Sequence, residues 1–277
     1  TPHLFLVRPA SFGYNLETAV NNAFQTLDPS MKEEDIRQQA MEEFDEFVSV
    51  LETNDLDIWV FQDPPEPVTP DAVFPNNWIS LHADGKMITY PMFAPSRRLE
   101  RHPKAIQYIE EHFEVSQRIS LEEAEEKDQF LEGTGSIVFD HVHKLAYACT
   151  SPRTHPDLMR TFCQKIGYEP VLFRATDVSH APIYHTNVMM SVGEQFVVIC
   201  PDVVRDDAEL NMLYDHFENT GKEIVEISVE QMMAFAGNML EVVNLRGEHL
   251  MIASEQAYQA LTSSQIVQLE QFARFVY

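Results

Sequence analysis

The sequence predicts a mixed α/β fold in which a unit of two or more strands and one helix recurs about five times and closes into a small propeller. The first observation is the spacing of the amphipathic segments, whose centres lie roughly 50 to 65 residues apart along the chain. The second is that short β-type runs, several of them in hairpin pairs, fill the intervals between these segments. Apolar residues make up 44% of the 277 residues, which is enough for a sizeable core. An ordinary mixed α/β sandwich is the alternative that this periodicity leaves open.

The longest predicted helix begins with a capping box, Ser30 followed by Glu33, and runs to about Thr53. Apolar residues recur along it at spacings of three and four, from Ile36 to Leu51. Four more helices are predicted, two of them stopped by a glycine: 103–113, 156–166, 207–220 and 263–274.

Short runs of β-branched, aromatic and other apolar residues predict the strands between these helices. Turns at 83–86, 141–144 and 193–194 join several of the runs into hairpins. The predicted strands are 3–8, 56–61, 78–82, 87–90, 137–140, 145–149, 187–192, 195–200, 223–227 and 250–253, and 275–277 is predicted as the beginning of a further strand.

The charge balance excludes several classes of partner. Lys and Arg number 19 and Asp and Glu number 44, so the formal net charge is −25, which repels phosphate backbones and anionic lipids. We therefore expect neither nucleic acid nor a membrane as partner. No apolar run approaches the ~20 residues that span a bilayer, and the first residues resemble no secretory signal. Three cysteines without metal-binding or disulfide spacing fit a reducing compartment, so we expect a cytoplasmic protein.

Residues able to do chemistry lie in loops and at strand ends rather than in the helices. Residues 70–78 carry Asp71 and paired carboxamides directly before a strand, although an Asn pair is also typical of a plain turn. Glu132 stands in a glycine-containing turn, where a carboxylate can act as acid, base or clamp for a cation. His185 lies at the start of an apolar strand and can act as a general base, but a lone histidine is more often structural.

Two arginines complete this set. Arg153 follows a predicted strand, and Arg97 stands in the run Ser96-Arg97-Arg98. A guanidinium offers a bidentate fork for a carboxylate, whereas a solvated surface arginine is the equally simple interpretation.

The order of these motifs resembles the guanidino-group-modifying superfamily of arginine deiminases, dimethylarginine hydrolases and amidinotransferases, and within it most of all the citrulline-utilisation hydrolases. The resemblance implies the pentein fold, a five-bladed α/β propeller of ββαβ modules with pseudo-fivefold symmetry, and no cofactor. It spans nearly the whole chain and rests further on Leu6-Val7-Arg8-Pro9-Ala10-Ser11-Phe12-Gly13, Val73-Phe74-Pro75-Asn76-Asn77-Trp78, Glu132-Gly133-Thr134-Gly135-Ser136, Cys149-Thr150-Ser151-Pro152-Arg153-Thr154 and Phe235-Ala236-Gly237-Asn238-Met239-Leu240-Glu241.

The resemblance also implies roles for the matching residues. His185 matches the catalytic histidine that protonates the leaving amine and then activates water, and Glu132 matches the acid that holds this histidine or the substrate's nitrogens. Asp71 and Asn77 match the clamp on the delocalised head group, with Asn77 a carboxamide where dimethylarginine hydrolases carry Asp. An amide suits a neutral ureido group such as that of citrulline.

The remaining matches concern the rest of the substrate. Arg97 and Arg153 match positions that bind its α-carboxylate, so the resemblance implies an amino acid as ligand. Phe74, Asn187 and Asn238 belong to the matching turns and are carried over as substrate-binding residues.

The largest departure from the family pattern is the nucleophile. The family chemistry needs a cysteine thiolate in a glycine-rich stretch near the C-terminus, and no cysteine follows Cys200. We therefore expect residues 1–277 to form a single amidinotransferase-like domain without its C-terminal closing strand, and the natural chain to carry that strand and the cysteine past Tyr277. Cys149 is the alternative nucleophile, whereas Cys163 and Cys200 are expected in the core.

The sequence therefore predicts a cofactor-free hydrolase that acts on the non-peptide C–N bond of a guanidino or ureido amino acid, citrulline first and arginine or methylated arginine second. An amidinotransferase and a non-catalytic amino-acid-binding protein, each using the same site, stay open, and a homodimer is the candidate assembly. We expect no metal. A metal-dependent hydrolase is the rival of another class, without a diagnostic ligand spacing, and it would use Asp140, His141, His143, His180 and His185.

Overall fold

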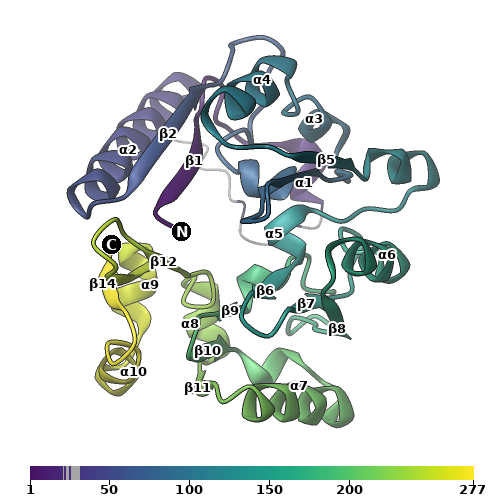
Figure 1. Ribbon diagram of the computed structural model, residues 1–277, viewed down its shortest axis with the longest axis vertical. Helices are drawn as coiled ribbons and strands as arrows, with labels where there is room; N and C mark the ends of the chain where they lie inside the picture. The colour runs from purple at the N-terminus through teal and green to yellow at the C-terminus, as the bar shows by residue number, and fades with distance from the viewer. Residues whose placement is uncertain (21, 23–24, 26–31) are drawn as a thin grey trace. The chain divides into compact units, whose positions relative to one another are not determined.

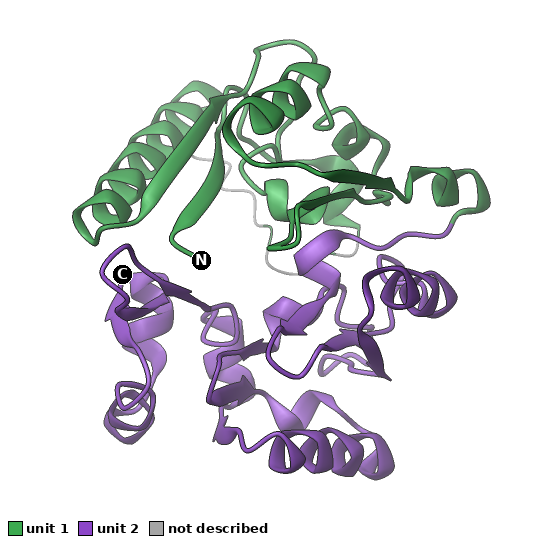
Figure 2. Ribbon diagram, in the orientation of Figure 1, with its two compact units in different colours: residues 1–128 green, residues 129–277 purple. Residues whose placement is uncertain are grey.

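The structure is a computed structural model that describes residues 1–20, 22, 25 and 32–277. The chain divides into two compact units, residues 1–128 and residues 129–277 (Figure 2). The strands of the described residues form five separate small sheets, two in the first unit and three in the second. The predicted mixed α/β class is confirmed, and the strands are divided among small sheets of two or three strands each.

The first sheet pairs β1 (His3–Arg8) in parallel with β2 (Asp57–Gln62). The helix α2 (Glu33–Thr53) connects the two strands and packs against both (Figure 1). The short helix α1 (Leu16–Ala19) precedes it. The predicted capping residue Ser30 lies outside the described residues.

The second sheet adds a hairpin to the same strand–helix–strand arrangement. β3 (Ile79–Leu81) runs antiparallel to β4 (Lys86–Thr89), and β5 (Gln117–Ser120) runs parallel to β4. The helices of this region are η1 (Pro75–Asn77), α3 (Pro95–Arg98), α4 (Pro103–His112) and η2 (Glu122–Lys127), of which η1 and η2 are 3₁₀ helices.

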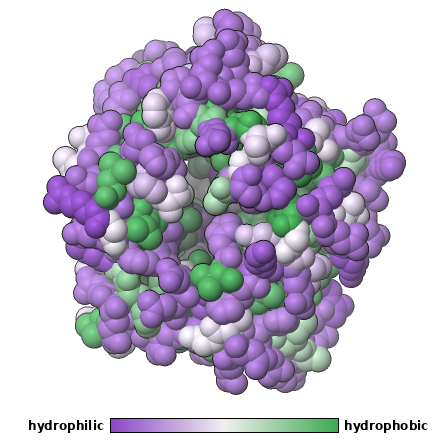
Figure 3. Space-filling view, viewed as in Figure 1, coloured by the Kyte–Doolittle hydropathy of each residue, from purple (hydrophilic) through white to green (hydrophobic). Residues whose placement is uncertain are grey.

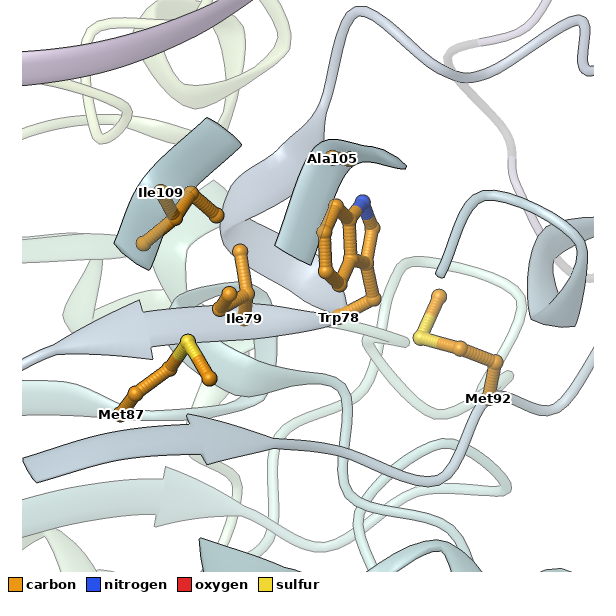
Figure 4. Packing of buried hydrophobic residues seen from close by; sticks show 6 residues of the cluster. All are labelled: Trp78, Ile79, Met87, Met92, Ala105 and Ile109. Atoms are coloured by element: carbon orange, nitrogen blue, oxygen red, sulfur yellow. The ribbon is translucent and has the colours of Figure 1, made fainter. Parts of the chain in front are cut away.

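Apolar side chains of the second sheet and of α4 form a core in the first unit (Figure 4). Trp78 and Met87 are 1% and 2% exposed, and Ile109 of α4 has no exposed surface. Each such side chain contributes about 1.5–3 kcal/mol through burial. This packing fixes the hairpin, and with it the turn of η1 that precedes β3.

The three sheets of the second unit repeat the plan of β3–β4–β5, with a hairpin, one or more helices and a third strand parallel to the second. Their strands are β6 (Val138–Asp140), β7 (Leu145–Cys149), β8 (Glu169–Phe173), β9 (Met190–Val192), β10 (Phe196–Ile199), β11 (Glu223–Glu226), β12 (Leu240–Val243), β13 (His249–Ile252) and β14 (Arg274–Val276). Their helices are α5 (Gly133–Ser136), α6 (Pro156–Ile166), η3 (Thr186–Val188), η4 (Pro201–Val203), α7 (Asp207–Asn219), α8 (Val229–Met233), α9 (Glu255–Ala260) and α10 (Ser263–Leu269).

The first strands of these sheets are neighbours, because β9 contacts both β6 and β12 (Figure 1). A short turn leads into each of the three strands: α5 into β6, η3 into β9, and residues 235–239 into β12. The turns α5 and η3 also contact one another. Residues carried by these turns are thereby held close together.

Several predicted boundaries differ from the structure. The strand predicted at 187–192 is shorter, because its first part forms η3. The helix predicted at 263–274 ends at Leu269, because Arg274 already pairs with β13. Three strands were not predicted, namely β5, β8 and β12. Both β5 and β8 are edge strands, and β8 contains a proline, which an edge strand tolerates.

The face shown in Figure 3 is mostly hydrophilic, as the excess of acidic residues leads one to expect. Across the described ranges, no helix combines the length and apolarity needed to cross a bilayer.

Candidate active site

The candidate site residues fall into one group in each unit. Glu132, Arg153, His185, Asn187 and Asn238 belong to the second unit. The first unit holds Asp71, Phe74, Asn77 and Arg97.

Glu132 and His185 form a buried pair in the second unit. Glu132 precedes α5 and His185 precedes η3, so the contact between these two turns brings the side chains together. The Nε2 atom of His185 lies 2.7 Å from Oε2 of Glu132, and the two residues are 5% and 0% exposed. A carboxylate at this distance orients the imidazole and stabilises its protonated form.

Arg153 is the third member of this buried group. Its Nη1 atom lies 3.4 Å from Oε2 of Glu132, and its guanidinium carbon lies 4.8 Å from the centre of the Tyr184 ring. The residue is 2% exposed. Because the guanidinium is turned inward to a carboxylate and an aromatic face, these contacts weigh against the expected role of Arg153 in binding a substrate carboxylate.

Asn187 and Asn238 meet through a hydrogen bond between their turns. The side-chain amide of Asn238 donates to the carbonyl of Asn187 at 3.1 Å. Gly237 permits this close approach, since a β-carbon there would lie 2.5 Å from the carbonyl oxygen of Val188. Asn187 is half-buried and Asn238 is exposed, so both side chains are within reach of a ligand.

Arg97 organises the group in the first unit. Its Nε and Nη2 atoms donate to the two carboxylate oxygens of Glu100 at 2.8 and 2.9 Å, and Nη1 donates to Oδ1 of Asn77 at 2.6 Å. Arg97 and Asn77 are 3% and 5% exposed. This bidentate pair with Glu100 weighs against the expected contact of Arg97 with a substrate carboxylate. The carboxamide of Asn77 is likewise bound within the protein.

The side chains nearer the surface in this turn are Asp71, Phe74 and Asn76. Phe74 is 46% exposed, and Asp71 and Asn76 are half-buried. Asn15, in the N-terminal segment, fixes Asp71, because its side-chain amide donates to Oδ2 of Asp71 at 2.7 Å. Of the two neighbouring carboxamides, Asn76 is therefore the one more accessible to a ligand.

Sequence reasoning missed three residues that support these groups. Glu100 carries the only sequence signal, its spacing of three from Arg97 in the i,i+3 ion pair. Asn15 and Ser136 are buried polar residues that join the groups through distant partners, Asp71 for Asn15 and the carbonyl of Arg153 for Ser136. Their roles depend on tertiary contacts, so no local pattern could identify them.

All three cysteines of the sequence are buried. Burial raises the pKa of Cys149 and of Cys200 to about 11, and that of Cys163 to about 12. The nucleophile of the expected chemistry is a thiolate, so a raised pKa makes each of them a poor candidate. This includes Cys149, the alternative weighed from the sequence.

Two residues of the metal-dependent alternative, Asp140 and His143, belong to an ion-pair network. Oδ2 of Asp140 lies 2.9 Å from Nδ1 of His143 and 3.0 Å from Nζ of the buried Lys222. Throughout the part of the chain that the structure describes, no three His, Cys, Asp or Glu side chains are grouped to hold a metal ion. The cation beside Asp140 is Lys222, and this arrangement gives the metal-dependent alternative no support.

Comparison with known proteins gives one family match. The profile of the family described as N,N dimethylarginine dimethylhydrolase, eukaryotic, matches residues 8–277. Among curated proteins nothing matches the chain.

Solved structures match the whole fold at low sequence identity. The N-terminal domain of ArgZ, an arginine dihydrolase from the ornithine-ammonia cycle in cyanobacteria, has a TM-score of 0.74 and 14% identity, over 99% of this chain and 89% of that domain. DDAH from Pseudomonas aeruginosa, solved as a mutant with citrulline, has a TM-score of 0.64 and 18% identity, over 99% and 91% of the two chains. In the apo structure of ArgZ the match has a TM-score of 0.75 and 14% identity, and covers 99% of this chain but 37% of that one. At these identities the likeness shows the fold alone.

Proposed function

The chain belongs to the family of N,N dimethylarginine dimethylhydrolases of the eukaryotic type, and on this premise we propose that it hydrolyses the non-peptide C–N bond of a guanidino or ureido amino acid. The observation that carries the proposal is the buried pair of His185 and Glu132, with 2.7 Å between Nε2 and Oε2. A proton-transfer group held by a buried carboxylate is what the two steps of such a hydrolysis need. Citrulline is the first candidate substrate, and arginine or a methylated arginine the second.

The proposed reaction runs through a covalent intermediate. A cysteine thiolate attacks the central carbon of the guanidino or ureido group, and the C–N bond breaks as His185 gives the leaving amine a proton. Water then attacks the S–C adduct while His185 takes up a proton, the S–C bond breaks and the thiolate is restored. Glu132 keeps the imidazole oriented through both steps.

The nucleophile is part of this proposal. The high pKa values of the three buried cysteines support the expectation that another cysteine, placed after Tyr277, attacks the substrate. The same burial favours a second candidate function, a non-catalytic amino-acid-binding protein.

The head group of the substrate is proposed to contact Asp71 and Asn76, with Phe74 as an apolar wall. In this proposal Asn76 takes the role that the sequence assigned to Asn77, because the carboxamide of Asn77 is bound to the buried Arg97. We expect Asn76→Asp to shift the preference from a neutral ureido group toward a cationic guanidinium, because a carboxylate attracts the cation. The ratio of kcat/KM for arginine to that for citrulline measures this shift. Asn77→Asp is the matched control, and a shift in that variant instead would return the role to Asn77.

We propose further that the five sheets are blades of one pseudo-fivefold propeller domain. Four sheets share one plan, and the first strands β6, β9 and β12 of the second unit are neighbours. By the same plan β1 corresponds to a middle strand, since a helix connects it to a parallel strand. The edge of β1 opposite β2 is where the plan places an antiparallel strand.

The test is turnover by the natural full-length protein. Citrulline, arginine and dimethylarginine are supplied in turn, and release of ammonia or dimethylamine is measured. We expect one of them to be hydrolysed, and His185→Ala and Glu132→Gln each to lower kcat by at least ~100-fold.

Matched controls are the exposed residues His180 and Glu218. His180→Ala and Glu218→Gln should keep wild-type rates. Loss of activity in His180→Ala would favour the metal-dependent alternative, and wild-type rates in His185→Ala would sink the proposal. Tight binding of a substrate without turnover would leave the binding protein as the function.

A further inference from the structure

We infer that Thr186 is a positioning residue for the pair of His185 and Glu132, because its buried hydroxyl ties the turn that carries His185 to the helix that follows Glu132. The inference deepens the proposed function and rests on it, since it names the residue that sets the geometry of the proposed proton-transfer group.

The hydroxyl of Thr186 bridges two segments that are distant in sequence. Its Oγ1 atom donates to the carbonyl of Ser136 at 2.6 Å and accepts the backbone N–H of Cys149 at 2.8 Å. Thr186 has no exposed surface, so water cannot take the place of either partner. A hydroxyl has one hydrogen to donate, and the carbonyl at the end of α5, at 2.6 Å, is a closer acceptor than Sγ of Cys149, at 3.4 Å.

Ser136 extends this hydrogen-bond network to Glu132 and Arg153. Its own hydroxyl accepts the backbone N–H of Glu132 at 2.9 Å and donates to the carbonyl of Arg153 at 2.8 Å. Ser136 has no exposed surface either. The backbones of Glu132 and Arg153 are thus fixed to the residue that Thr186 holds, and Thr186 directly follows His185 in the chain.

The consequence is that one hydroxyl connects both halves of the pair. Without it, the turn of His185 and the turn of Glu132 keep their van der Waals contact but lose the hydrogen bond that sets their spacing. A displacement of ~1 Å at a proton-transfer group can lower turnover by about 100-fold. Binding of the substrate should change little, because Thr186 itself is buried away from solvent.

The test compares Thr186→Val, which keeps the shape and removes the hydroxyl, with Thr186→Ser, which keeps the hydroxyl. In the full-length protein we expect Thr186→Val to lower kcat about 10- to 100-fold with KM within about twofold of wild type. Thr186→Ser should recover most of the loss. Thr89→Val is the matched control, since Thr89 is also buried and its hydroxyl donates to Glu122 in the first unit.

A second readout does not depend on turnover. The NMR titration of the His185 imidazole reports its environment, in which Glu132 and Tyr184 contact the ring and Arg153 contacts both of these residues. Cys149, whose backbone N–H bonds Thr186, carries a further titratable group, its thiol. We expect a changed titration in Thr186→Val and a wild-type titration in Thr186→Ser and Thr89→Val. If the wild type turns over no substrate, the proposed function fails while this titration still decides the role of Thr186.

Two outcomes would overturn the inference. One is wild-type kcat and titration in Thr186→Val. The other is equal loss in Thr186→Val and Thr186→Ser with the titration unchanged, which would reduce Thr186 to a packing residue. Should Thr186→Val fail to fold, Thr186→Cys has a weaker hydrogen-bonding group and should give an intermediate kcat, and wild-type kcat there would contradict the inference equally.

Discussion

Glu132 has no exposed surface, so its charge has to be balanced from inside the protein. Arg153 supplies a permanent positive charge 3.4 Å away, whereas the charge of His185 depends on its protonation. Because Arg153 always faces the carboxylate, His185 can lose and regain its proton without leaving Glu132 unpaired. In the proposed reaction, Arg153 is thus the ion that leaves the imidazole free for proton transfer.

This explanation predicts the effect of Arg153→Met. Without the guanidinium, Glu132 has only the imidazole to balance its charge, so His185 should hold its proton more tightly and transfer it poorly. We expect kcat to fall ~100-fold with KM changed little. Steady-state kinetics over a range of substrate concentrations measures the two constants. A rise in KM at unchanged kcat would instead restore the α-carboxylate role that the sequence suggested.

The three buried cysteines should be unreactive in the folded protein. With a pKa of about 11, Cys149 is a thiolate in only about one molecule in a thousand at pH 8. We expect iodoacetamide to leave Cys149, Cys163 and Cys200 unmodified in the native protein at pH 8 and to modify all three in urea, as peptide mass spectrometry would show. Rapid native alkylation of Cys149, with loss of activity, would make it the nucleophile after all.

The raised pKa values of the cysteines also predict how the stability of the protein depends on pH. A thiol whose pKa is raised on folding binds its proton more tightly in the folded state. Its contribution to stability is therefore complete below the unfolded pKa of about 9.0 and is lost as the pH rises toward 11. Chemical denaturation at pH 8 and pH 10.5 should therefore show lower stability at the higher pH.

At the scale of the elements, a buried ion pair ties neighbouring sheets of the second unit together. Lys222 precedes β11, and its Nζ atom bonds Asp140 of β6 at 3.0 Å and the carbonyls of Gly193 and Glu194 at 3.0 and 2.8 Å. Burial acts to raise the pKa of Asp140, but hydrogen bonds from His143 and Lys222 outweigh it and lower the pKa. Asp140 therefore stabilises the fold above its unfolded pKa near 3.8, and this is lost as the pH falls through the lower folded value.

Breaking this pair from one side should be costly. We expect Lys222→Met to lower the free energy of unfolding at pH 7 by about 3–5 kcal/mol, because it leaves the Asp140 carboxylate buried and unpaired. The double variant with Asp140→Asn should lose less than the sum of the two single variants. Urea denaturation of the four proteins completes the cycle, with Arg160→Met in an exposed pair as the control. Additive losses would mean that the two side chains act independently.

A local sequence pattern predicted some boundaries of the helices and strands correctly and others wrongly. The helix at 156–166 was predicted correctly, because Pro156 begins it and Gly167 ends it in a left-handed conformation with φ of 75°. The end of α10 was wrong because pairing between β14 and β13 is not visible in a local pattern. The pairing of Glu132 with His185 was among the alternatives that the family resemblance implied. The burial of Arg97, Arg153 and Asn77 was not predicted. It depends on tertiary contacts with buried residues such as Glu100, which binds the guanidinium of Arg97.

At the scale of the whole molecule, acidic residues outnumber basic ones by 25. A uniform excess of one charge destabilises the compact state by self-repulsion, and salt screens it, with a Debye length of about 30 Å at 0.01 M and about 8 Å at 0.15 M. Exposed ion pairs such as Arg174 with Glu209 lose some attraction in the same salt, but each contributes at most about 1 kcal/mol. The repulsion should therefore dominate.

We accordingly expect the melting temperature at pH 7.5 to rise between 0.01 and 0.15 M NaCl. Choline chloride at equal ionic strength should have the same effect, because screening does not depend on which cation supplies it. Near the isoelectric point, about pH 4.6, the net charge approaches zero and the rise should disappear, as scanning calorimetry at the two pH values can show. A melting temperature that falls with salt at pH 7.5 would mean that local ion pairs, rather than the net charge, govern the electrostatic stability of this protein.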